Sequence, residues 1–220
     1  GSGTINATSE GAGFDMEFNP SGLNYGISQR GVSVNMLLTE FPLPISFSAS
    51  ELATSILFPL QKSEDDQEFG MAVTMSGVTI SDTIWGIFDP TSQLPRTPAN
   101  LILDLSGTAK VLFDFLDPAQ ADILATTDAE PGALKTLDLN KLELDAAGAR
   151  LTGKGDFKFD NSDLVTFDGF PRPEGGMDLA LTGGNTLIDK LGQGGMGMVY
   201  RAQQDHVARE VALKVINPRV

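Results

Sequence analysis

The chain contains no cysteine and a single histidine, His206. The lack of cysteine excludes disulfides, thiolate catalysis and cysteine-ligated zinc or iron–sulfur sites. One histidine gives little basis for a usual zinc site or for a Ser/His/Asp triad. Without these residues, a hydrolase would have to rely on clustered carboxylates alone. The absences therefore argue against a hydrolase.

Positive charge and long apolar runs are also scarce. The chain has 15 Lys and Arg against 29 Asp and Glu, a net charge of -14. A nucleic-acid partner needs a basic surface, and docking to an anionic membrane needs one too, so neither is expected. No apolar run approaches the roughly 18–20 residues of a membrane span. No signal-peptide pattern is present either.

The charge changes sign along the chain. Residues 1–190 hold 11 basic and 27 acidic residues, whereas residues 191–220 hold 4 basic and 2 acidic ones. Such a change indicates two segments of different character. We therefore expect a β-rich domain over residues 1–188 and a separate segment over residues 189–220.

Apolar residues recur at every second position through most of the first segment. This period predicts strands with one apolar and one polar face, which is typical of antiparallel sheets. The expected fold class is mainly β, an antiparallel meander with one apolar face. Turn signals are expected at residues 19–22, Gly31, Gly77, Gly107 and residues 153–155. The alternating sets are Phe14, Met16, Phe18; Leu23, Tyr25, Ile27; Val32, Val34, Met36; Phe69, Met71, Val73, Met75; Leu101, Leu103, Leu105; Leu142, Leu144; Phe157, Phe159; and Met177, Leu179, Leu181.

Two short stretches are expected to be helical. Residues 81–88 open with capping residues and end at Asp89-Pro90. Residues 119–125 follow Asp117-Pro118, where the missing N–H of proline is tolerated at a helix start. The acidic, fully polar residues 61–68 indicate a solvated loop or a helix end.

Near the C-terminus, residues 192–199 read G-x-G-x-x-G-x-V. A dinucleotide-binding fingerprint of this kind would open a helix. Here the following residues 198–202 predict a strand, and Lys214 comes fifteen residues after Val199 within the sequence Val-Ala-Leu-Lys. Residues 190–217 therefore resemble the start of a bacterial serine/threonine protein kinase, with its Gly-rich loop and lysine strand.

The resemblance implies an ATP site. By resemblance, Val199 and Ala212 would enclose the adenine and Lys214 would neutralise the α/β-phosphates. The implied cofactor-binding residues are Gly192, Gly194, Gly197, Val199, Ala212 and Lys214. Only Val215–Val220 follow the lysine, without a catalytic loop or a metal-binding Asp. We therefore expect no enzyme and no catalytic residue, and ATP as a ligand only if this segment is functional.

Residues 4–190 resemble a bacterial family of unknown function, domain-of-unknown-function 2125. The resemblance is carried by residues 87–96, by residues 103–110 and by the loop of residues 164–175. It implies a β-rich protein exported to the periplasm or cell envelope, and no catalytic residues. The junction with the kinase-like segment is expected near residues 186–191.

Two alternatives stay open. Asp156, Asp160, Asn161, Asp163 and Asp168 offer oxygen ligands but lack the EF-hand spacing, so a solvated acidic loop is preferred to a metal site. The apolar face forms either a closed core or a groove for a hydrophobic ligand or an envelope protein. The expected function is thus a non-enzymatic envelope module for binding or scaffolding, with an ATP-binding kinase fragment as the alternative.

Overall fold

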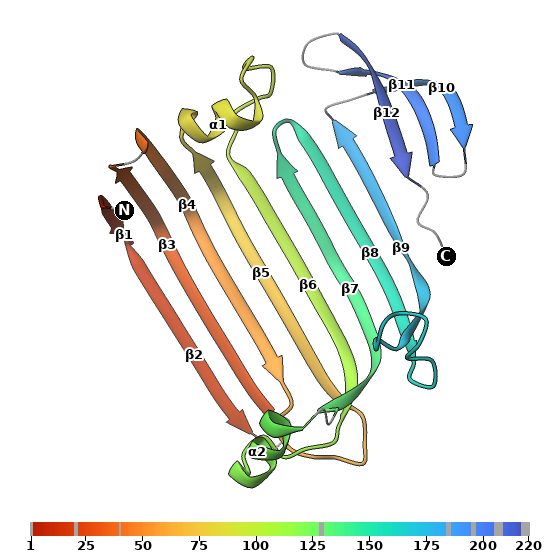
Figure 1. Cartoon of the computed structure of the whole chain (residues 1–220). Helices are drawn as coiled ribbons and strands as arrows, with labels where there is room; N and C mark the ends of the chain where they lie inside the picture. The colour runs from red at the N-terminus through yellow and green to blue at the C-terminus, as the bar shows by residue number, and fades with distance from the viewer. Residues whose placement is uncertain are drawn as a thin grey trace.

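The computed structural model describes residues 2–19, 22–39, 41–127, 130–183, 186–194, 197–204 and 209–216. In this part of the chain the fold is mainly β, with two sheets and two short helices (Figure 1). The prediction of fold class is confirmed. The helices are α1 (Asp82–Phe88) and α2 (Pro118–Thr126).

The large sheet is an antiparallel meander in which each strand from β3 to β9 pairs with the next. β1 and β2 both pair with β3 and cover its two halves. The strands are β1 (Gly3–Thr8), β2 (Gly11–Asn19), β3 (Gly22–Leu38), β4 (Phe41–Phe58), β5 (Gln67–Ile80), β6 (Ala99–Val111), β7 (Gly132–Ala146), β8 (Ala149–Asp160) and β9 (Arg172–Gly183).

The small sheet contains β10 (Thr186–Gly194), β11 (Gly197–Gln204) and β12 (Arg209–Ile216). Its strands pair antiparallel with one another, and in the described residues no strand pairing joins the two sheets. The predicted hairpin and following lysine strand are therefore present, and the small sheet begins within the expected junction region.

Both helices begin where the sequence predicts. Ser81 is the N-cap of α1, in extended conformation. At α2, the Asp117 side chain accepts a hydrogen bond from the Ala119 amide at 3.0 Å, and Pro118 occupies the first helical turn. Residues 61–66 form the predicted polar loop, after which β5 begins.

The prediction of turns at four glycine positions is wrong. Gly31, Gly77, Gly107 and residues 153–155 lie inside β3, β5, β6 and β8. Gly107 is needed for packing, because a Cβ there would come within 2.5 Å of the Phe69 ring. The turn at residues 19–22 includes Pro20 and Ser21, which lie outside the described residues.

Gly31 and Gly77 mark a row where the alternation of the strands shifts. Their φ angles are +59° and +60°, in the left-handed region that favours glycine. At this row β5 holds one residue more than β6, so Met75 pairs with Leu101 and Val78 with Ala99. Leu101 and Ala99 point to the same face, so Met75 and Val78 share that face although they are three positions apart.

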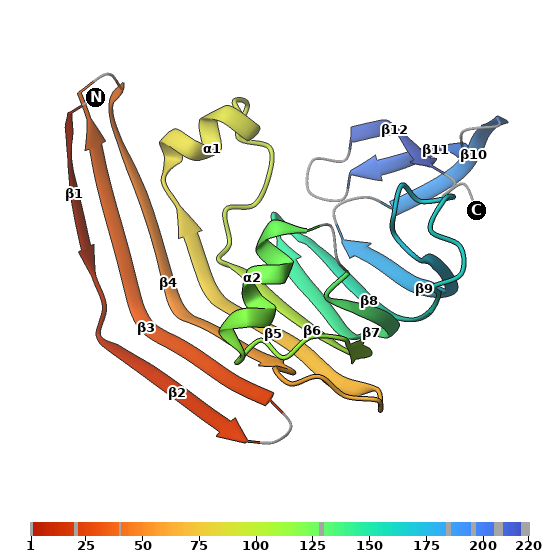
Figure 2. The ribbon, with the colours of Figure 1, turned by 60° about the horizontal axis from the view of Figure 1, so that its bottom comes forward.

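The sheet is strongly curved, and both helices lie on its concave side (Figure 2). The Phe115 ring, just before α2, packs on the Phe58 ring at 5.6 Å. At the other end, Trp85 of α1 lines a space together with Val78 and Ala99. Phe58, Val78 and Ala99 belong to the apolar face, so the concave face of the sheet is the apolar one.

The described residues contain almost no closed core. Apart from glycine and proline, only four described apolar residues are buried, namely Val32, Ala49, Val111 and Ala202, and none of the described large side chains is completely buried. Folded domains normally bury most of their Val, Leu, Ile, Phe and Met side chains. In this chain those side chains gather on one open face.

Candidate functional site

The candidate site is the concave face of the large sheet, here called the apolar trough. Residues directly opposite one another in antiparallel strands share a face, so the pairing register defines its members. They are Ile5, Phe14, Met16, Phe18, Leu23, Tyr25, Ile27, Val32, Val34, Met36, Ile45, Phe47, Leu52, Ile56, Phe58, Phe69, Met71, Val73, Met75, Val78, Ile80, Leu101, Leu103, Leu105, Leu137, Leu139, Leu142, Leu144, Leu151, Phe157, Met177, Leu179 and Leu181.

The apolar rows continue from strand to strand across the whole sheet. In one row Leu52 pairs with Met75, and that row goes on through Leu101 and Leu144 to β8 and β9. On the opposite edge the rings of Phe14 and Tyr25 pack edge to face at 5.4 Å. The predicted alternation is thus confirmed, and it produces one continuous surface.

This surface carries no charge. Among the paired residues of β1–β9 that the register assigns to the trough, none is ionised at neutral pH, and Gln29, Thr54 and Gln67 are polar exceptions. An unpaired charge facing apolar neighbours would be costly. The trough therefore suits an uncharged, apolar occupant.

The side chains of the trough are partly accessible, most of all along the two edges. Phe14 on β2 and Leu181 on β9 are each 60% exposed. Away from the two ends of the sheet, the described residues on the central strands are half-buried by their neighbours within the same sheet. Between the closed core and the groove that the sequence left open, the described residues form an open groove.

One end of the trough is partly roofed by α1. A space of about 360 Å³ lies there between Val78, Ile80, Trp85 and Ala146. The Arg96 guanidinium lies 5.9 Å from the centre of the Trp85 ring and forms an ion pair with Asp82. This end is therefore apolar inside, with a paired charge at its rim.

The other end is partly roofed by the segment that contains α2. The Phe115 amide donates a hydrogen bond to the Leu60 carbonyl at 2.8 Å, which ties this segment to the loop between β4 and β5. The Gln120 side chain accepts from the Asp114 amide at 2.9 Å. As far as the structure describes the chain, the trough is thus covered only at its two ends.

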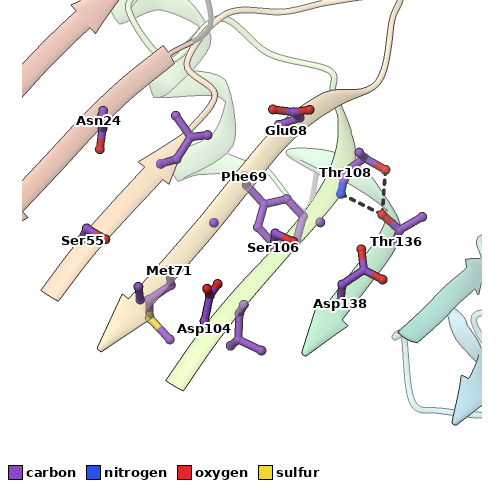
Figure 3. A pocket seen from close by; sticks show the side chains of 15 residues that line it. Asn24, Ser55, Glu68, Phe69, Met71, Asp104, Ser106, Thr108, Thr136 and Asp138 are labelled. Atoms are coloured by element: carbon purple, nitrogen blue, oxygen red, sulfur yellow. Dashed lines mark hydrogen bonds between the residues drawn. The ribbon is translucent and has the colours of Figure 1, made fainter. Parts of the chain in front are cut away.

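The convex face is polar and contains a different hollow. Figure 3 shows Asn24, Ser55, Asp104 and Ser106 around a space of about 490 Å³ over the centre of the sheet. Small residues such as Gly70 leave this space open. Its lining combines hydroxyl, amide and carboxylate side chains with apolar residues such as Leu57 and Ala72, so this face differs from the trough mainly in carrying ionised groups.

The acidic residues of the β8–β9 region bond to their own loop. Asp160 and Asp163 lie near Arg172, at 3.0 Å and 3.9 Å from its guanidinium nitrogens. Hydrogen bonds from Ser162 lower the pKa of Asp160, and hydrogen bonds from Thr166 lower that of Asp163. In the described ranges no group of acidic or histidine side chains is arranged to hold a metal ion. His206 lies outside those ranges.

Several residues of the predicted ATP site fall into one row of the small sheet. Gly192 pairs with Val199, and Val199 pairs with Lys214. Gly194 and Gly197 face each other where β10 and β11 meet, whereas Ala212 pairs with Arg201. Gly195 and Met196, between the two strands, lie outside the described residues.

No family model matches the chain, and searches of curated proteins and of solved structures find no match either. The resemblances to the kinase start and to the envelope family therefore stay expectations. Across the described residues, neither helix has the length and apolar character needed to span a bilayer.

Proposed function

We propose that residues 1–188 form a non-enzymatic module that binds hydrocarbon chains along the apolar trough. The observation that carries this proposal is the open apolar face, which continues across the whole sheet without a charged residue in its paired rows. Exposed apolar patches of this extent mark interaction surfaces. Acyl chains need only apolar contact and fit a surface that offers no charged partner.

A hydrophobic partner protein is the competing occupant. A second protein would have to fill a wide curved surface, and stable protein interfaces also carry polar rims with about one hydrogen bond per 100–200 Å². The trough rows offer few polar groups for that purpose. Location in the cell envelope, which the family resemblance implies, is part of the proposal because exported lipids and acyl chains occur there.

The test compares two neighbouring residues of β5 that face opposite sides. Val73 pairs with Leu103 in the trough, and Thr74 pairs with Ile102 on the convex face. Val73→Asp should raise the dissociation constant of a fluorescent fatty acid by at least about tenfold, because a carboxylate is then buried against the acyl chain. Thr74→Asp should change it by less than about threefold.

Both variants place Asp in the same strand, so the loss of strand propensity is matched. Unfolding midpoints of both variants show whether each is folded during the titration. Equal affinities in the two variants, or no probe bound by the unmutated chain, would contradict the proposal. Saturation of the trough by a co-purified protein instead of lipid would favour the partner-protein alternative.

A second candidate function is ATP binding by the small sheet. It is favoured by the row that joins Gly192, Val199 and Lys214. A phosphate-binding loop holds nucleotide tightly only when a lower lobe closes the cleft, because charge contacts are weak in water. Residues 189–220 supply no such lobe, so this segment by itself is expected to bind ATP more weakly than millimolar and to transfer no phosphate. Micromolar binding by calorimetry that Lys214→Met abolishes would contradict this.

A further inference from the structure

The loop of residues 161–171, between β8 and β9, presents three large apolar side chains to solvent. Val165 is 90% exposed, Phe170 70% and Phe167 46%. We call these three residues the apolar tip. The loop lies at the same end of the sheet as α2 and rises on the concave side (Figures 1 and 2). The apolar tip therefore stands at one end of the trough.

A tight turn fixes the outward direction of the two Phe residues. Phe167 and Phe170 form an isolated β-bridge, and the Phe170 amide donates to the Phe167 carbonyl at 3.0 Å. Between them, Asp168 and Gly169 have φ angles of +51° and +95°. A two-residue Asp-Gly turn of this kind is typical of tight hairpins.

The base of the loop is tied together by polar contacts. The Asp163 carboxylate accepts from the Thr166 amide at 3.1 Å and from the Thr166 hydroxyl at 2.9 Å. The Arg172 amide donates to the Asp163 carbonyl, and the Arg172 guanidinium donates to Asp160 at 3.0 Å. The apolar tip is thus held outward by the fold of its own loop, although the hydrophobic effect favours its burial.

The size and charge of the apolar tip indicate which partner would bury it. A stable protein interface buries about 800 Å² on each partner, far more than three side chains on one loop can supply. A fluid bilayer needs no complementary shape and takes up aromatic and aliphatic side chains at its interface. Residues 160–174 carry four carboxylates and one cation, Arg172, which lies near Asp160, Asp163 and Glu174, so anionic headgroups would be repelled.

We propose that the apolar tip inserts into the surface of a bilayer of neutral, zwitterionic phospholipid. At the same end of the sheet, Leu116 and Ile123 are 46% and 45% exposed and widen the apolar contact. Insertion brings one end of the trough to the lipid phase, where acyl chains are available. This last step rests on the proposed function, whereas membrane binding itself does not.

The test measures co-sedimentation of the full chain with phosphatidylcholine vesicles. Replacing all three residues of the apolar tip by Ser should weaken partition by at least about tenfold, since most of the inserted apolar area is lost. The matched control replaces Ile87 and Phe88 of α1 by Ser. These side chains are equally exposed, at 70% and 72%, but lie at the opposite end of the sheet. The control should partition within about twofold of the unmutated chain.

Substitution of part of the phosphatidylcholine by phosphatidylglycerol should weaken binding, and added salt should restore it. The proposal is overturned if the unmutated chain does not sediment with neutral vesicles, or if the control loses as much binding as the tip variant. It is also overturned if the tip variant changes the oligomeric state measured without vesicles, because the tip would then be a contact between copies.

The fatty-acid titration separates this proposal from the proposed function. The tip variant should bind the soluble fluorescent fatty acid as the unmutated chain does, because the trough is unchanged. Conversely, Val73→Asp should leave vesicle binding intact. If the unmutated chain binds vesicles but not the fatty-acid probe, the trough function is refuted and the membrane proposal is not.

Discussion

The two faces of the large sheet are made by the same strands, yet they are stabilised in different ways. On the convex face the Asn140 side chain donates to Asp104 and Ser106, and Arg150 lies 3.5 Å from Glu143. On the concave face the paired residues are apolar except Gln29, Thr54 and Gln67, and within the described part of the chain this face is covered only at its ends. The polar groups of the convex face are satisfied by one another and by water. The concave face is stabilised by any apolar material that removes its side chains from water.

The row marked by Gly31 and Gly77 is where mutation should most disturb the alternation that separates the two faces. A Cβ at Gly77 would lie 2.6 Å from the Ser50 hydroxyl oxygen, and its φ of +60° is unfavourable for a branched residue. We expect Gly77→Val to lower the free energy of unfolding by about 3 kcal/mol or more, from strain and misplaced alternation.

Gly86 of α1 serves as the control, because nothing lies within 4 Å of a Cβ added there. Gly86→Ala should be neutral or stabilise by up to about 1 kcal/mol. Urea unfolding followed by circular dichroism measures both. A Gly77→Val loss below about 1 kcal/mol would show that the shift in alternation does not depend on this glycine.

Truncations in the trough should cost less than truncations in a closed core. Met71 and Phe157 point into the trough and are only half-buried. We expect Met71→Ala and Phe157→Ala to cost about 1–2 kcal/mol each, against roughly 2–5 kcal/mol in a packed core. Thr74→Ala on the convex face should stay within about 0.5 kcal/mol. Denaturant unfolding that gives core-like losses for both trough variants would mean that the trough is filled or closed in solution.

Acid should loosen the loop that carries the apolar tip before it affects the central strands. The pKa values of Asp160 and Asp163 are lowered from 3.8 in the folded chain by hydrogen bonds from Ser162 and Thr166. A lowered folded pKa means that the stabilisation is complete above the unfolded value and is lost as the pH falls through the folded value.

Protection of the Thr166 amide against hydrogen exchange should therefore decrease only below about pH 4. The Leu103 amide, in the centre of the sheet, serves as the reference. Protection of Thr166 that already disappears near neutral pH, or that persists in Asp163→Ala, which removes the acceptor, would contradict the assigned role of this carboxylate.

Removal of the small sheet should have the smallest effect on the stability of the large sheet. In the described residues β10–β12 pair only with one another and share no ladder with β1–β9. A chain ending at residue 188 should therefore keep its β circular-dichroism signal and its unfolding midpoint. Loss of cooperative unfolding would show that the small sheet covers or completes the large one.

The sequence predicts the faces of the strands better than their ends. Alternation around Met71 and Leu103 depends only on the period of two, which a single sequence displays. The residue at which a strand ends depends on how far the adjacent strand pairs with it. A glycine in the sequence does not show where that pairing stops. Gly31 and Gly77 suit a turn as well as a bulge, because both need a positive φ.

The openness of the trough was beyond sequence reasoning for a similar reason. An apolar stripe looks the same whether a second layer covers it or not. The apolar tip was also missed as a site, although its signal was present. Phe167 and Phe170 flank an Asp-Gly turn, so two large aromatic residues stand at a hairpin tip where polar residues are usual.

The nearest-neighbour order of the strands has a consequence for how such a protein can change in size. In a closed core, an extra pair of strands must be matched by repacking on the opposite layer. Here each of β3 to β9 pairs only with the strands next to it, and no described residue forms a second layer over the middle of the sheet. An inserted hairpin that keeps the alternation would lengthen the lining by two strands and leave the rest in place. Capacity could then grow in equal steps, as it does in proteins built from structural repeats.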